Sequence, residues 1–145
     1  MQRLDTQPHP QFLGAGNKLA DRCVIVRLSD AVDLALLFPA GAVGVVVDTY
    51  NVWWDSGLAA GIARAHGRIV SYQLGDWVSP LPADALLGRG HLGDGCIDFG
   101  PVTRQVLAAG YAGYAEVEIF NQEVWDAPAD ETASTVKARF AAALG

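Results

Sequence analysis

The chain has 145 residues, of which 51% are hydrophobic and 18% charged, and its formal net charge is −6. This length suits one domain, and this composition is too apolar for a disordered chain. The acidic balance and the lack of a lysine and arginine cluster argue against nucleic-acid binding, which depends on attraction to phosphates. No apolar run reaches the roughly 18 residues of a membrane span. The first residues lack the apolar core of a signal peptide, so we expect a cytoplasmic protein without a membrane partner.

Strand and helix patterns alternate along the first half of the chain. A short strand is expected within Gln2–His9, followed by a helix over Leu19–Phe38, whose apolar residues recur every three or four positions. A continuous valine run predicts a strand with both faces covered at Gly44–Asp48. A helix at Leu58–Ala65 and a strand at Arg68–Leu74 are expected next.

The alternation continues after a long loop. This loop, Gly75–Phe99, is rich in proline and glycine, and a loop of such length in a compact domain is usually functional or disordered. Pro101 suits the first turn of a helix at Val102–Ala109. A strand at Tyr114–Phe120 and a last helix at Glu131–Leu144 follow. Strands alternating with helices predict an α/β fold with a parallel sheet, either open and doubly wound or part of a (β/α)₈ barrel.

Polar side chains stand where the predicted strands end. The valine strand ends in Asp48, Gln73 lies near the end of the next strand, and Asp76 comes just after it. Glu116 and Glu118 lie on the last strand and, because side chains alternate, both face away from the helix-covered side. Catalytic groups of parallel α/β folds gather at the carboxyl ends of the strands. The sequence therefore places a candidate site at this end of the sheet.

Two interpretations of these carboxylates are open, because a charge inside an apolar sheet is costly unless it is paired or bound. Asp48 and Glu118 could share one divalent cation, since carboxylate oxygens suit Mg²⁺ or Mn²⁺. Alternatively, Asp48 accepts hydrogen bonds from turn amides and Glu118 pairs with Arg89 or Arg104. Trp54 and its neighbour would either line a pocket or anchor the core.

Three motifs resemble those of the xylose-isomerase-like sugar phosphate isomerase/epimerase family. They are Val45–Asp55, Arg89–Phe99 and Ala109–Phe120, and they match in order and spacing across roughly Leu4–Leu144. The resemblance implies the (βα)₄ half of a TIM barrel, with strands five to eight in a single half-barrel domain over residues 1–145. A complete barrel needs about 250 residues. The chain is then a fragment, a partner of a complementary N-terminal half-barrel, or one half of a homodimer, which we favour for a stable isolated chain.

The resemblance also implies metal-dependent chemistry. Family members bind a divalent metal at the strand ends and move a proton between neighbouring sugar carbons through an enediolate. Carried onto this chain, Asp48 and Glu118 match metal ligands, and Glu118 also matches a catalytic acid/base. Arg89 matches a substrate-binding arginine, and Asp76 a polar position after strand seven. The implied cofactor is Mn²⁺, Mg²⁺ or Zn²⁺, and the implied partner is a small sugar-like molecule.

Three positions depart from the family pattern. Thr6 stands where a metal-ligating glutamate is expected, Gln73 where a histidine ligand is expected, and Asn51 where an active-site histidine follows the aspartate. Gln73 could still offer an amide oxygen to a metal, but this is a poorer ligand than imidazole for most transition metals. Asn51 and Trp54 are candidate substrate contacts. The sequence therefore predicts either an isomerase or epimerase with impaired chemistry, or an inactive binding or structural half-barrel.

Overall fold

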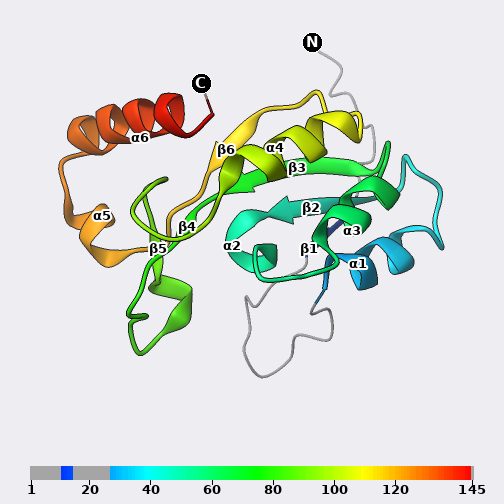
Figure 1. Ribbon diagram of the computed structural model, residues 1–145, viewed down its shortest axis with the longest axis horizontal. Coiled ribbons are helices and arrows are strands. Elements are labelled where there is room, and N and C mark those ends of the chain that lie inside the picture. Colours follow the sequence, from blue (N-terminus) through cyan, green and yellow to red (C-terminus); the bar gives the residue numbers. More distant parts are fainter. Residues whose placement is uncertain (1–10, 15–26, 145) are drawn as a thin grey trace, which may run out of the picture.

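The computed structural model describes residues 11–14 and 27–144 of the chain (Figure 1). The strand expected within Gln2–His9, with Thr6, lies outside the described residues, as does the part before residue 27 of the helix expected over Leu19–Phe38. The first described strand is β1 (Gln11–Gly14), and the first described helix is α1 (Leu28–Ala35). From α1 onward every expected helix and strand has a counterpart in the structure.

The central sheet has four parallel strands. After β1 come β2 (Val43–Asp48), β3 (Ile69–Leu74) and β6 (Ala115–Val117), in the spatial order β1-β2-β3-β6. Strands that follow one another in the sequence are therefore neighbours in space, as in consecutive units of a (β/α)₈ barrel. Within the described residues the sheet is not closed, and β1 and β6 are its outer strands. This confirms the predicted parallel α/β arrangement of a partial barrel.

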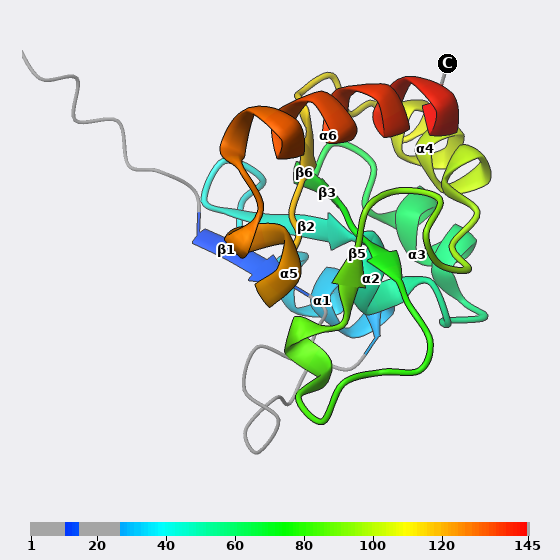
Figure 2. The ribbon, with the colours of Figure 1, turned by 90° about the vertical axis from the view of Figure 1, so that its left-hand side faces the viewer.

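Helices follow the strands and form one layer beside the sheet. The longer ones are α3 (Leu58–Arg64), α4 (Phe99–Ala108) and α6 (Ala129–Leu144), and the shorter ones are α2 (Thr49–Val52) and α5 (Gln122–Asp126). α1 packs beside α3, α3 beside α4, and α4 beside α6 (Figure 2). No helix in the described part of the chain is both long enough and apolar enough to cross a membrane.

Side-chain alternation gives the sheet two different faces. Val45 and Val47 of β2, with Tyr72 and Leu74 of β3, are buried in a core that also contains residues of α1, α3 and α4. The residues between them, on the other face, are more accessible: Val46, Ser71 and Gln73 are half-buried, and Glu116 of β6 is exposed. The helices therefore cover one face of the sheet. The other face, which would point into a barrel interior, is more accessible to solvent.

The loop expected over Gly75–Phe99 contains structure that the sequence signals did not reveal. β4 (Asp76–Trp77) and β5 (Arg89–Gly90) form a two-stranded antiparallel sheet, and the 3₁₀ helix η1 (Ala85–Leu87) stands between them in the chain. Two-residue strands are too short to show a periodic pattern. In Figure 1 this segment lies at the end of the sheet toward which the arrowheads of β2 and β3 point.

We predict that Ile62→Ala lowers the free energy of unfolding by about 2–5 kcal/mol, because this fully buried α3 side chain would leave a cavity in the core. Leu107→Ala in α4, where the side chain is 58% exposed, is the matched control and should change it by less than about 0.5 kcal/mol. Urea unfolding followed by circular dichroism measures both. Equal effects would contradict the described core.

Candidate functional site

The carboxyl ends of β2, β3 and β6 bring the predicted polar residues to one edge of the sheet. Asp48, the last residue of β2, is in register with Gln73 of β3, and Gln73 is in register with Glu116 of β6. Glu118 follows β6, and its amide donates to the main-chain oxygen of Leu74 at 2.8 Å. We call the edge formed by Asp48, Gln73 and Glu118 the strand-end rim.

Asp48 is held by a buried arginine. Arg89 Nη1 donates to Asp48 Oδ1 at 3.1 Å and Nη2 to Oδ2 at 2.9 Å, a parallel two-bond pairing. Asp48 is 2% exposed and Arg89 0%. The Tyr50 amide donates to Oδ1 at 3.1 Å, and Asn51 Nδ2 to Oδ2 at 2.5 Å. Each oxygen of Asp48 therefore accepts two hydrogen bonds.

The same guanidinium also reaches Glu118 and lies between two aromatic rings. Arg89 Nη1 is 3.2 Å from Glu118 Oε2 and donates to the Glu118 main-chain oxygen at 3.4 Å. The guanidinium carbon lies 4.7 Å from the centroid of the Tyr50 ring and 5.2 Å from that of Phe120, distances at which ring faces attract a cation. Glu118 thus pairs with Arg89, one of the two partners considered for it from the sequence.

The main chain around Arg89 is fixed on both sides. Arg89 is paired with Trp77 in the β4–β5 sheet, and Asn121 Nδ2 donates to the Arg89 main-chain oxygen at 2.9 Å. Gly75 allows the main chain after β3 to lie close to that of Glu118, because a Cβ at this position would lie only 2.7 Å from the Glu118 main-chain oxygen. Asn121 also caps α5 by accepting from the Glu123 amide at 2.9 Å.

Asp76 organises the glycine-rich loop beyond β5. Its carboxylate is 0% exposed and accepts four backbone amides at 2.8–3.0 Å. The donors are the amides of Trp77, Gly93, Gly95 and Ile97. Its predicted contact with substrate remains a prediction, and in this structure its hydrogen bonds shape the loop that carries Arg89.

The remaining predicted site residues, Asn51 and Trp54, follow Asp48 in the chain. Asn51 is half-buried and bound to Asp48, whereas Trp54 is 47% exposed just beyond α2. Beneath them the Tyr50 and Trp77 rings stack with centroids 4.9 Å apart, and the Trp53 ring lies 5.7 Å from Trp77. The two rings that contact the Arg89 guanidinium, Tyr50 and Phe120, were not identified as site residues from the sequence, although both lie within the family-like motifs.

Burial raises the pKa of the Asp48 carboxyl above its ordinary value of 3.8, and the Arg89 charge and hydrogen bonds act in the opposite direction. The charge of Glu118 adds to the upward shift, while the Tyr50 amide opposes it. The loss of hydration is therefore the largest influence on this carboxyl. Its ionised form depends on the guanidinium beside it.

The donors present do not fit a divalent metal in this arrangement. Both oxygens of Asp48 already accept from Arg89, and Glu118 faces the same guanidinium. A divalent cation about 4 Å from the guanidinium would be repelled by about 8 kcal/mol at an effective dielectric constant near 20. Across residues 11–14 and 27–144, no group of three or more His, Cys, Asp or Glu side chains is placed to hold a metal ion.

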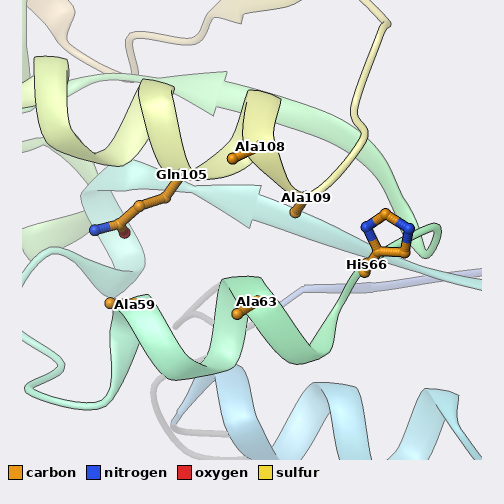
Figure 3. A pocket seen from close by; sticks show the side chains of 6 residues that line it. All are labelled: Ala59, Ala63, His66, Gln105, Ala108 and Ala109. Carbon is orange, nitrogen blue, oxygen red and sulfur yellow. The ribbon is translucent and has the colours of Figure 1, made fainter.

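A groove on the outer layer is a different kind of surface. It lies between α3 and α4, has a volume of about 250 Å³, and is lined by Ala59, Ala63, Ala108, Ala109, His66 and Gln105 (Figure 3). Alanines dominate this lining, and no carboxylate is present in it. The strand-end rim, where charged groups from three strands converge, is therefore the better candidate for a functional site.

Parallel strands that are neighbours in chain order, with helices between them and polar groups at their carboxyl ends, are typical of the TIM-barrel class. Residues 6–140 match the xylose isomerase-like TIM barrel family, and the chain belongs to that family. A comparison with curated proteins gave no match.

Several solved structures resemble the chain, and three of them illustrate the range. Protein SMc04130 from Sinorhizobium meliloti is 38% identical, with a TM-score of 0.86 over 93% of this chain and 50% of its own. IolI protein with a bound zinc atom is 18% identical, with a TM-score of 0.76, and the match covers 93% of this chain and 48% of IolI. A xylose isomerase-like TIM barrel/4-hydroxyphenylpyruvate dioxygenase fusion protein is 23% identical, with a TM-score of 0.63. This match covers 80% of this chain and 19% of the fusion protein. The last two show the fold alone, and the chain spans about half the length of the first two.

We predict that Asp76→Ala lowers the free energy of unfolding by about 3 kcal/mol, because four backbone amides, one buried and three partly buried, lose their acceptor. The matched control is Asp84→Ala. Asp84 caps the exposed η1 with a single side-chain hydrogen bond, and its loss should cost about 1 kcal/mol. Urea unfolding compares the two variants, and a smaller loss for Asp76 than for Asp84 would contradict the organising role.

Proposed function

We propose that this chain is a binding half of a xylose isomerase-like barrel that holds a small sugar-like molecule at the strand-end rim. The family supports the ligand class, since it includes sugar isomerases and epimerases. The observation that carries the proposal is the convergence of Asp48 and Glu118 on one buried arginine at the ends of parallel strands. Clustered charged and amide groups at such a position suit a ligand with many hydroxyl groups.

The accessible part of the rim would make the direct contacts. The Glu118 side chain is 25% exposed, and Gln73 and Asn51 are half-buried, so these three can offer hydrogen bonds to hydroxyl groups. Trp54 adds an exposed ring against which the apolar face of a sugar can pack. Arg89 is completely buried, so we propose that it acts on the ligand through Glu118 rather than by direct contact.

We propose that metal-dependent isomerisation through an enediolate is impaired in this chain. Glu118, the predicted acid/base, is paired with Arg89, and Gln73 replaces the histidine that the family resemblance predicts. The second candidate is an isomerase or epimerase that binds Mn²⁺, Mg²⁺ or Zn²⁺ through Asp48 and Glu118. It is favoured by the convergence of these carboxylates and by the zinc atom of IolI, and it requires Arg89 to leave them.

We also propose that the open sheet associates with a second copy of this chain, a complementary half-barrel being the alternative partner. The support is that β1 and β6 are outer strands of the described sheet, and that exposed strand edges favour pairing with other strands. Sedimentation equilibrium of the purified chain tests this: we expect a dimer at micromolar concentration. A compact monomer at all concentrations would count against self-association. A cytoplasmic location remains a prediction.

We predict that titration with a panel of ketoses, aldoses and cyclic polyols, with and without phosphate groups, identifies at least one that binds. Removing a charged or stacking contact should weaken binding about tenfold in Glu118→Gln and in Trp54→Ala. The matched control is Tyr114→Ala, whose 89% exposed ring precedes β6 at the opposite end of the sheet. Isothermal titration calorimetry measures the dissociation constants. Binding that is unaffected by both rim substitutions would place the ligand elsewhere.

A further inference from the structure

The Arg89 guanidinium stands at the point where Asp48 and Glu118 converge. Two of its nitrogens meet the two oxygens of Asp48, and one of these nitrogens also lies 3.2 Å from Glu118 Oε2. The cation that two carboxylates at strand ends require is therefore present as a side chain. Unlike a dissociable ion, this cation is covalently part of the chain.

We propose that Arg89 is a built-in cation that takes the place of a divalent metal, so that the strand-end rim of this chain assembles without one. We base this proposal on the poor fit between the side chains at the rim and a divalent metal. Asp48 has no oxygen that lacks a hydrogen-bond donor, and Gln73 contributes an amide in place of an imidazole. The proposal does not depend on whether a sugar-like molecule binds.

Several contacts keep the guanidinium in this position. The rings of Tyr50 and Phe120 contact the guanidinium, and the main-chain oxygen of Arg89 accepts a hydrogen bond from Asn121. The β4–β5 pairing with Trp77 fixes the strand from which the side chain starts. A guanidinium that moves aside for a metal would give up both aromatic contacts, and would leave the buried Asp48 carboxylate without its partner.

The first test measures metal content on the intact chain. The protein is stripped with EDTA, dialysed against Zn²⁺ or Mn²⁺, and analysed by mass spectrometry for bound metal, with calorimetry in parallel. We expect no difference in metal content between the wild type and Asp48→Asn. One equivalent of metal bound to the wild type and lost in Asp48→Asn would overturn the proposal. This measurement requires no sugar. Its result therefore tests the role of Arg89 independently of whether the chain binds a sugar-like molecule.

The second test asks whether removing the arginine creates a metal site. Arg89→Met keeps an apolar stem and removes the charge, and Gln73→His adds an imidazole at the neighbouring strand end. We expect the double variant to bind about one equivalent of Zn²⁺, and Zn²⁺ to raise its melting temperature, with both effects lost on adding Asp48→Asn. Arg64→Met with Gln73→His is the matched control, because Arg64 is a half-exposed arginine that pairs with Asp33 at the surface. A folded double variant that gains no zinc would count against the proposal; if it does not fold, the wild-type measurement decides.

Discussion

The buried ion pair between Arg89 and Asp48 is the interaction on which the rest of the rim depends. Breaking a buried pair by removing one partner costs about 3–5 kcal/mol, because a charge is left without compensation. That is a large part of the roughly 5–15 kcal/mol that holds a typical domain folded. Asp48 ends β2, in which five of six residues are buried, and Arg89 is the first residue of the two-residue strand β5. This pair therefore connects the segment after β3 to the central sheet.

A chain of local interactions places Arg89 opposite Asp48. Asp76, two residues after β3, accepts from three amides of the glycine-rich loop beyond β5 and from the amide of Trp77, the residue that pairs with Arg89. Gly75 allows the Glu118 main chain, whose oxygen accepts from Arg89 Nη1, to lie close to the end of β3. Asn121 holds the Arg89 main chain from the β6 side. The segment between β3 and α4 thus supplies Arg89 and part of the structure that holds it opposite Asp48.

The central sheet could be predicted from the sequence because its signals are strong and local. The run at Val45, the helical spacing of apolar residues and the prolines and glycines at the element ends led to the alternating order, and alternation along β6 placed Glu116 and Glu118 on the face opposite the helices. The β4–β5 pair could not be predicted, since strands of two residues have no period. The partner of Asp48 was also undetermined, because pairing across 41 residues depends on how the loop returns.

The glutamine at position 73 is consistent with a strand-end rim in which Arg89 is the cation. A histidine is useful beside a metal because imidazole donates an electron pair to it. Beside a guanidinium that electron pair has no metal to bind, and a protonated imidazole would be repelled by the positive charge already present. Gln73 is neutral at every pH, and its amide can accept or donate a hydrogen bond next to Asp48. Asn51, likewise neutral, donates to the Asp48 oxygen that Arg89 Nη2 also contacts. The two departures from the family pattern therefore agree with the buried arginine. Each neutral amide is compatible with a cation that is already part of the chain, and an amide oxygen is a poorer ligand than imidazole for most transition metals.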